Sequence, residues 1–245
     1  MGIEDHVEIG IYAHRFEPKY LIPLYESLKE TAPTIPVKLW IAPGNVHQNF
    51  SKIMDEAKKE FYIVLDEDLV FLEAGWVDIL IQDLIDNPKL GVVGTGQVKT
   101  EGKKFDYEMG LLEKPVGLTL QKWFPAHVVA CHRGRVGEIR PDLAIPGSKG
   151  MSDLDYCLQV RKAGWDIGLD DRVVVYHADK PFDDQSRLEL QNPTLSQEAA
   201  FFPQQVLFMW KKWGEMYKEL TLGFNEQWLP RIRQVFAEDG EPCPW

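Results

Sequence analysis

Apolar runs and amphipathic segments alternate through the first part of the chain, and each change of period indicates a new element. The expected strands cover residues 7–12, 37–41 and 61–70, and the expected helices between them cover residues 18–30 and 50–59. This order, strand-helix-strand-helix-strand, is typical of a parallel sheet with right-handed helical crossovers. The pattern therefore predicts a fold of the α/β class.

The rest of the chain continues this pattern less regularly. Ser152 followed by Asp155 predicts a capping box at the start of one helix, and Gly164 predicts its end. Residues 95–124 are mixed in composition and predict loops with short strands. The other expected elements are helices over residues 75–86, 151–163 and 196–220, strands over residues 90–94, 126–131 and 165–176, and a polar turn over residues 132–134.

Three acidic residues follow the third apolar run directly, at Asp66, Glu67 and Asp68. In an open α/β sheet, ligands bind beyond the carboxyl ends of the strands. Asp66 and Asp68 are two residues apart, so in an extended segment their side chains point to the same side. Two converging carboxylates repel each other unless a cation lies between them, and oxygen ligands suit Mg2+ or Mn2+. The alternative interpretation is a solvated acidic turn.

Net charge, cysteine count and the N-terminal residues indicate which partners and which cellular compartment to expect. The net charge of -11 argues against nucleic acid as the main partner, since phosphate binding needs Lys and Arg. Three widely spaced cysteines show neither zinc spacing nor a disulfide framework, which predicts a reducing cytoplasm. Residues 1–6 lack the parts of a signal peptide, and no apolar run reaches the length of a membrane span. Only a peripheral membrane contact stays open.

Two common nucleotide-binding motifs are missing. The stretch after the first expected strand, Ala13-His14-Arg15-Phe16, has no G-x-G-x-x-G pattern, and the chain has no P-loop. The sequence therefore does not predict a standard dinucleotide site.

Three stretches, taken in order, carry a resemblance to a known family. Leu65-Asp66-Glu67-Asp68 is similar to a D-x-D motif, and residues 152–165 are similar to an E-D-x-D-L-x-L-R-x-R-x-x-G segment with Ser152 in place of the glutamate. His177 matches a histidine that closes the next strand. Together they resemble the family-2 inverting glycosyltransferases of the GT-A fold. The resemblance implies a Rossmann-like, mostly parallel central sheet flanked by helices over residues 1–180, with a C-terminal helical extension over residues 181–245.

The resemblance also implies a reaction, namely transfer of a sugar from a nucleotide-diphosphate sugar donor to an acceptor hydroxyl with Mn2+ or Mg2+. Asp68 is then a direct metal ligand, Asp66 holds the ribose side or reaches the metal through water, and His177 is a further ligand. Asp153 is the candidate base for an inverting transfer. The alternative for Asp153 is a helix cap, and a cap is the preferred role for Asp155.

Further residues would flank the donor by their positions. They are Ala13, His14 and Arg15 after the first strand, Asn49 and Ser51 at the start of the second helix, and Lys180 on the polar loop beyond His177. A helix cap explains Asn49 and Ser51 equally well, and a solvated surface position explains Arg15 and Lys180.

Several alternatives remain open at the level of sequence. The chain is expected to be an inverting transferase, but a retaining transferase of the same fold, or a non-catalytic nucleotide-sugar-binding module, fits the same motifs. The acceptor is undetermined among saccharides, lipid-linked molecules and small molecules, and homo-oligomerisation is undetermined too. The aromatic cluster over residues 201–213 packs onto the sheet, forms a dimer contact or acceptor wall, or lies at a membrane surface.

Overall fold

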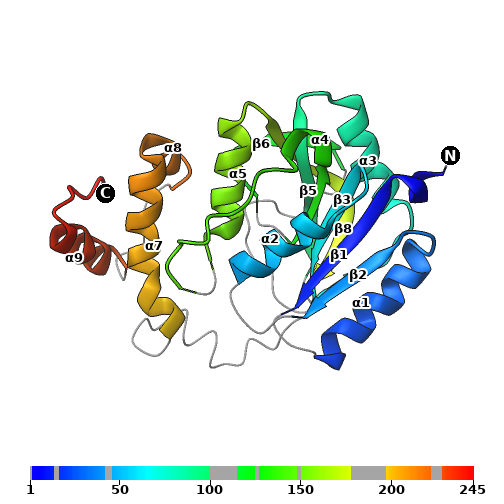
Figure 1. The fold of residues 1–245 in the computed structure, drawn as a ribbon, viewed down its shortest axis with the longest axis horizontal. Helices are drawn as coiled ribbons and strands as arrows, with labels where there is room; N and C mark the ends of the chain where they lie inside the picture. Colours follow the sequence, from blue (N-terminus) through cyan, green and yellow to red (C-terminus); the bar gives the residue numbers. More distant parts are fainter. Residues whose placement is uncertain are drawn as a thin grey trace.

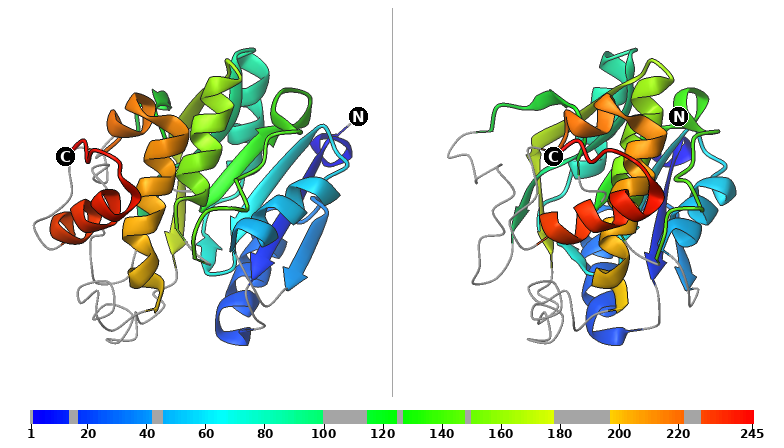
Figure 2. Two further views of the ribbon diagram at one scale, coloured as in Figure 1. Left: turned by 60° about the vertical axis from the view of Figure 1, so that its left-hand side comes forward. Right: turned by 90° about the vertical axis from the view of Figure 1, so that its left-hand side faces the viewer.

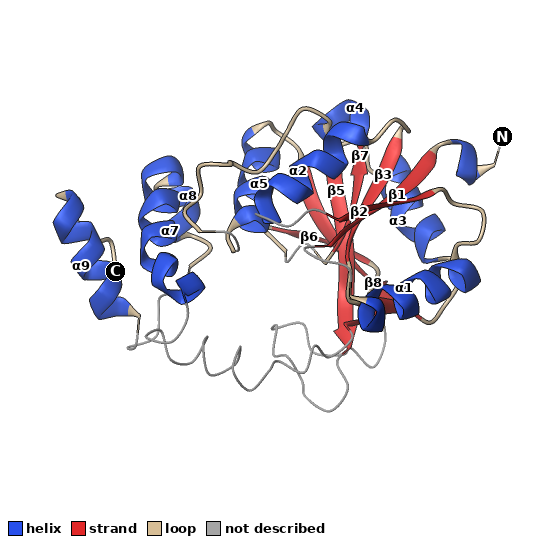
Figure 3. Cartoon of the chain, turned by 60° about the horizontal axis from the view of Figure 1, so that its bottom comes forward, coloured by secondary structure: helices blue, strands red, loops and turns tan. Residues whose placement is uncertain are grey.

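The computed structural model describes residues 2–13, 17–41, 46–99, 115–124, 127–147, 150–177, 197–221 and 228–245. A central sheet with helices on both of its faces occupies most of this part of the chain (Figures 1 and 3). The strands are β1 Val7–Ala13, β2 Val37–Ile41, β3 Phe61–Asp66, β4 Leu69–Phe71, β5 Leu90–Lys99, β6 Leu118–Gln121, β7 Val128–His132 and β8 Asp166–His177. The helices are η1 Ile3–Asp5, α1 Pro18–Thr31, α2 Val46–Glu56, α3 Trp76–Asp86, α4 Arg133–Val136, α5 Ser152–Lys162, α7 Gln197–Trp213, α8 Glu215–Lys218 and α9 Leu229–Asp239.

The eight strands follow the order β2-β1-β3-β7-β5-β8-β4, and β6 pairs with β8. β1 is parallel to both β2 and β3, as the alternating pattern predicts. β7 runs antiparallel to its neighbours β3 and β5, whereas β8 is parallel to β5. β2, β1, β3, β5 and β8 therefore share one direction, and β7, β4 and β6 run the other way. The sheet is mostly parallel, and its order places the antiparallel strand β7 near the centre.

The two faces of the sheet support two separate apolar clusters. Successive strand residues point to opposite faces, so Ile63 and Leu65 of β3 join the cluster under α1 and α3, while Tyr62 and Val64 join the one under α2 and α5. All four are buried, which is why β3 reads as a continuous apolar run. A Cβ at Gly10 of β1 would collide with the side chain of Ile53 of α2, so this glycine permits the close approach of helix and strand.

The acidic segment differs from its prediction as a single strand over residues 61–70. β3 ends at Asp66, residues 67 and 68 form a turn, and β4 begins at Leu69. Asp66 and Asp68 therefore do not lie in one extended segment, and the argument that placed them on the same side was wrong. Glu67 and Asp68 are nevertheless buried within the turn, so the alternative of a solvated acidic turn is wrong as well.

Several element boundaries also differ from their predictions. The second helix begins at Val46 and ends at Glu56 rather than covering residues 50–59, because its apolar positions fix the buried face and not the ends. β5 extends to Lys99 instead of ending at residue 94, and the expected turn over residues 132–134 is the end of β7 and the start of α4. The sequence reasoning missed α9, although Pro230 in its first turn and the left-handed Gly240 at its end are typical helix boundary signals.

The C-terminal helices pack against α5 and against one another. A third apolar cluster joins Leu154 and Leu158 of α5 to residues of α7, α8 and α9, and α7 lies beside α5 in both views of the chain (Figures 1 and 2). Of the three interpretations of the aromatic cluster over residues 201–213, packing onto the sheet is wrong, because its described members pack against α5 and the other C-terminal helices. A dimer contact or acceptor wall, and a membrane surface, stay predictions. The division of the chain at residue 180 stays a prediction. None of the helices in the described ranges is both long and apolar enough to span a membrane.

An acidic pair with an unusual proton affinity connects α3 to β8. Arg172 Nη2 donates a hydrogen bond of 3.0 Å to Asp83 Oδ1 and also pairs with Asp170. Burial and the adjacent Asp170 carboxylate raise the pKa of Asp83 to about 7. Burial would also raise the pKa of Asp170, but the hydrogen bonds from Arg172 outweigh it and lower that pKa. Asp83 therefore keeps its proton in the folded chain up to near neutrality.

Asp83→Asn is expected to flatten the dependence of stability on pH. The pKa of Asp83 is about 3.9 in the unfolded chain and raised in the folded chain, so its stabilisation is complete below about pH 4 and is lost as pH rises through about 7. Thermal unfolding at pH 5 and pH 8.5 should show the wild type losing about 2–3 kcal/mol more than the variant. Asp78→Asn, an exposed change on the same helix, is the control. Equal pH slopes for wild type and Asp83→Asn would contradict the raised pKa.

Candidate functional site

Three side chains converge at the edge of the sheet where β3 and β8 end. Asp66 is the last residue of β3 and His177 is the last residue of β8, while His127 directly precedes β7. Because β7 is antiparallel to β3, its first residues lie at the same edge as the last residues of β3. The backbone N–H of Asp66 donates to the carbonyl of His127 at 3.1 Å, which fixes the two residues side by side.

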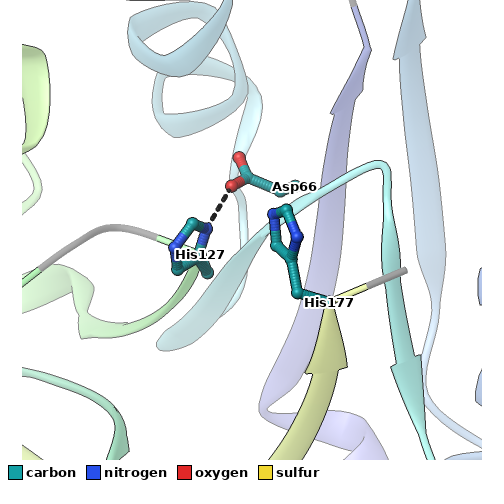
Figure 4. Close-up of side chains that lie close together, drawn as sticks. All are labelled: Asp66, His127 and His177. Carbon is teal, nitrogen blue, oxygen red and sulfur yellow. Dashed lines mark hydrogen bonds and ion pairs between the residues drawn. The ribbon is translucent and has the colours of Figure 1, made fainter. Parts of the chain in front are cut away.

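The three side chains are close enough to act on one ligand. His127 Nδ1 lies 2.8 Å from Asp66 Oδ2, and the rings of His127 and His177 meet edge to face with centroids 4.9 Å apart (Figure 4). One ligand atom from each of the three residues lies within 4.8 Å of the others. Among the described residues, this is the one group of histidine, cysteine and acidic side chains that meets such a criterion.

Asp68 lies next to this group without belonging to it. Its Oδ1 is 3.5 Å from His177 Nε2, so its carboxylate contacts one of the two histidines. Both Asp68 and its neighbour Glu67 are buried. The structure therefore places Asp66 and His177 in one group with His127, and it places Asp68 beside His177. The role of Asp66, Asp68 and His177 as metal ligands stays a prediction.

Asp66 and His127 each favour the charged form of the other. Burial alone would lower the pKa of His127, but the hydrogen bond and negative charge of Asp66 outweigh burial and raise it. Burial alone would raise the pKa of Asp66, but the hydrogen bond and charge of His127 outweigh burial and lower it. Burial and the Asp66 carboxylate together raise the pKa of Tyr12 well above its usual range, so this phenol stays protonated beside the group.

Asp153 reaches the same region from α5. It lies in the first turn of that helix, and its Oδ1 accepts a hydrogen bond of 2.8 Å from the backbone N–H of Leu154. Burial raises the pKa of Asp153, the carboxylate of Asp66 adds to the rise, and the Leu154 N–H and the charge of His127 oppose it. These electrostatic influences indicate that Asp153 lies near Asp66 and His127.

The donor set of this group fits a divalent cation. Two imidazole nitrogens and a carboxylate oxygen are ligands that suit Mn2+ and similar metals. Ligand atoms bound to one ion at about 2.1 Å lie at most about 4.2 Å apart, so the observed group needs only small side-chain rotations to share an ion. The buried carboxylate of Asp68, beside His177, adds negative charge that favours a cation at this position.

The predicted donor-binding residues are described only in part. Ala13 ends β1 and is fully buried, and Asn49 and Ser51 are buried inside α2. Because α2 begins at Val46, Asn49 and Ser51 do not cap it, and that alternative was wrong. His14, Arg15 and Lys180 lie outside the described residues. The role of all six residues in donor binding stays a prediction.

Two features of the site escaped the sequence reasoning. His127 was read as part of a strand over residues 126–131, although it precedes β7, and its position beside Asp66 depends on the strand order. The capping box of Ser152 and Asp155 was wrong, because Met151 is the N-cap of α5 and no side chain caps this end. Asp155 is fully buried and bonds to α7 instead. Gly164 does end the helix, with φ +88° and a bond from its N–H to the carbonyl of Arg161.

The chain was compared with family models, curated proteins and solved structures, and only the solved structures are similar to it. No family model matches the chain, and no curated protein matches it. Solved structures do match, and the three described next are each 10–13% identical to the chain. A mannosyltransferase from Pyrobaculum calidifontis in complex with GDP-Man and Mn2+ is 12% identical with a TM-score of 0.61, over 96% of this chain and 75% of that one.

Two further matches differ in how much of their own length is covered. GalNAc-T7 with UDP, GalNAc and Mn2+ is 13% identical with a TM-score of 0.63, over 95% of this chain and 54% of that one. TarS of S. aureus in complex with UDP-GlcNAc is 10% identical with a TM-score of 0.58, over 95% of this chain and 80% of that one. The chain thus spans about half of GalNAc-T7 and more of the other two. It has the GT-A fold, as the resemblance implied.

Proposed function

We propose that the chain is a metal-dependent glycosyltransferase that moves a sugar from a nucleotide-diphosphate sugar to an acceptor hydroxyl. The observation that carries the proposal is the convergence of Asp66, His127 and His177 at the carboxyl edge of a GT-A sheet. Asp153 lies near enough for the charges of Asp66 and His127 to affect its pKa. The similar structures hold GDP-Man, UDP and UDP-GlcNAc, and two of them hold Mn2+, which supports this class of donor and metal.

Asp66, His127 and His177 would hold the cation, with Asp68 beside His177. A divalent cation bound there supplies a Lewis acid that stabilises the negative charge of a leaving diphosphate. Mn2+ suits this set better than Mg2+, because imidazole nitrogen is a poorer ligand for Mg2+. The lowered pKa of Asp66 keeps its carboxylate ionised at neutral pH, as a metal ligand must be.

Asp153 would accept the proton of the acceptor hydroxyl as the sugar is transferred with inversion. A general base works best when its pKa is close to the pH at which the enzyme operates, and burial raises the pKa of Asp153 in that direction. The Leu154 N–H bound to Oδ1 orients the carboxylate. NMR of the anomeric centre of the product tests this step, since an inverted centre supports Asp153 as base and a retained centre would move the reaction to the retaining class.

The donor would lie between the ends of β1 and β3 and the first turns of α2. Ala13, Asn49 and Ser51 are buried in these elements. Ser51 Oγ is buried and makes no hydrogen bond within the described part of the chain, so a ribose hydroxyl or a polar group of the nucleobase would satisfy it. His14, Arg15 and Lys180 are proposed to complete the donor site through the ribose and the diphosphate.

A thermal-shift panel of nucleoside diphosphates, with and without Mn2+, tests the donor and metal sites together. At a ligand concentration of 100 times Kd, binding stabilises the folded chain by about 2.7 kcal/mol, which raises Tm by about 5–10 °C for a chain of this size. One diphosphate is expected to give this shift with Mn2+ and to lose most of it when EDTA is added.

Nucleosides without phosphates are the matched ligands, and they are expected to give no shift. Equal shifts with and without Mn2+ would contradict a shared metal and diphosphate site. A chain that binds a diphosphate sugar tightly but releases no diphosphate over hours would be a binding module and not an enzyme.

A further inference from the structure

Asp155, in the first turn of α5, makes its contacts on the side of the helix opposite to Asp153. Residues two apart on a helix point in directions roughly 200° apart, so Asp155 leaves α5 on the side opposite to Asp153. Asp155 is fully buried, with a relative exposure of 0%. A buried carboxylate is costly unless its oxygens are satisfied, which makes the partners of Asp155 informative.

Both oxygens of Asp155 have two donors each. Oδ1 accepts a hydrogen bond of 2.8 Å from Trp213 Nε1 and lies 2.8 Å from Lys212 Nζ, both at the end of α7. Oδ2 accepts from the backbone N–H of Asp142 at 2.8 Å and from Gln159 Nε2 at 2.7 Å. This set of four donors around one carboxylate, here called the Asp155 clamp, joins α5 to α7 and to the loop at residue 142.

Two further contacts tighten the same region. Lys212 Nζ also donates to Asp142 Oδ2 at 2.8 Å, so one ammonium group bridges two carboxylates. The backbone N–H of Asp155 donates to the carbonyl of Met151 at 2.8 Å. Met151 has φ +62°, a left-handed conformation that residues with a side chain rarely adopt. The backbone on either side of Asp153 is therefore held in one arrangement by contacts that do not involve Asp66, His127 or His177.

We propose that Asp155 is a positioning residue for the transfer reaction, through which the C-terminal helix α7 sets the place of the Asp153 carboxylate. The inference rests on the proposed function, because it assigns Asp153 the role of base. The inference gives α7 a part in the reaction through α5. Lys212 and Trp213 contact Asp155 of α5, and not the proposed metal group, which consists of Asp66, His127 and His177. A misplacement of a reacting group by about 1 Å can cost roughly 10²-fold in rate.

Asp155→Asn is the sharpest test, because asparagine keeps the size of the side chain but replaces one of its two acceptor oxygens with a donor. All four partners are donors, so the NH2 of asparagine must face two of them whichever way the amide turns. The turnover number for transfer is expected to fall about 10- to 100-fold. The affinity for nucleoside diphosphate with Mn2+, measured by calorimetry, is expected to stay within about threefold, because the metal group is not touched.

Trp213→Phe and Lys212→Met are milder variants that remove one donor each and guard against a failure of Asp155→Asn to fold. Val206→Ala is the matched control for stability, since Val206 is fully buried on α7 in the same apolar cluster but outside the clamp. It is expected to lower Tm while leaving the turnover number within about twofold, since it loses only apolar contacts.

A double-mutant cycle with Asp153→Asn separates positioning from general stability. If Asp155 acts through Asp153, adding Asp155→Asn to Asp153→Asn lowers transfer no further. Turnover of Asp155→Asn within twofold of wild type, or losses that simply add in the cycle, would overturn the inference alone. A wild-type chain that neither transfers nor hydrolyses any donor would instead overturn the proposed function on which it rests.

Discussion

Asp66→Asn is expected to lower sugar transfer by roughly 10³-fold, because it removes the one carboxylate in the metal group. Charge stabilisation by a cation at a leaving group amounts to several kcal/mol, and each 1.36 kcal/mol corresponds to a factor of ten in rate. The variant also leaves His127 without the anion that raises its pKa, so this imidazole ionises less readily. Initial rates measured across a range of Mn2+ concentrations, with calorimetry of Mn2+ and nucleoside diphosphate, give both effects.

His177→Ala is expected to behave similarly in metal binding, since it removes a second member of the same group. Glu73→Gln is the matched control, because Glu73 is an exposed carboxylate a few residues beyond Asp66 and its neutralisation should leave rate and affinity unchanged. Loss of rate in Asp66→Asn that excess Mn2+ does not relieve, with diphosphate affinity equal to wild type, would remove Asp66 from the metal site.

The elements that the sequence predicts well are those whose periodicity and burial agree. β1, β2 and β3 and their two crossover helices follow the predicted order, because their apolar positions match one face of a helix or both faces of a strand. A strand that is buried on both faces shows a continuous apolar run instead of alternating apolar and polar residues, and β3 has such a run. The parallel pairing of β1 with its two neighbours follows from the crossovers.

The break between β3 and β4 could not be predicted from the same signal. Apolar residues resume immediately at Leu69, so local pattern alone continues the strand through Glu67 and Asp68. The chain turns here because β3 pairs with β1 and β7, whereas β4 pairs with β8, which is not a neighbour of β3 in the sheet. That pairing is set by the order of strands in the sheet, which short-range pattern does not contain.

The candidate site also depends on strand order and tertiary contacts that local sequence pattern does not contain. Asp66, Asp68 and His177 follow from strand ends and from the family resemblance. His127 joins them because an antiparallel β7 lies between β3 and β5, so that its start meets their ends. Asp155 looked like a cap from its spacing to Ser152, but contacts with α7 about sixty residues away determine its role. Tertiary contacts of this kind override local sequence rules at both positions.

Asp153→Asn is expected to lower transfer by about 10³- to 10⁴-fold, near the upper limit of general base catalysis, with diphosphate affinity in Mn2+ within about threefold of wild type. Burial raises the pKa of Asp153, so its ionised form is disfavoured in the folded chain. Replacing it by a neutral side chain of the same size should therefore leave Tm equal or higher at neutral pH. A loss of activity with no loss of stability is the signature expected of a base rather than of a structural residue.

The pH dependence of the wild type provides the decisive measurement. Only ionised Asp153 can accept a proton, so the transfer rate should rise with pH through an apparent pKa above the usual aspartate value of about 3.9. The residual rate of Asp153→Asn should lack this limb, and Asp153→Glu should keep it at a reduced rate. Because Asp66 adds to the rise in the pKa of Asp153, Asp66→Asn should move the limb to lower pH in whatever activity remains. An acid limb that is unchanged in Asp153→Asn would assign the proton transfer to another group and remove Asp153 from the reaction.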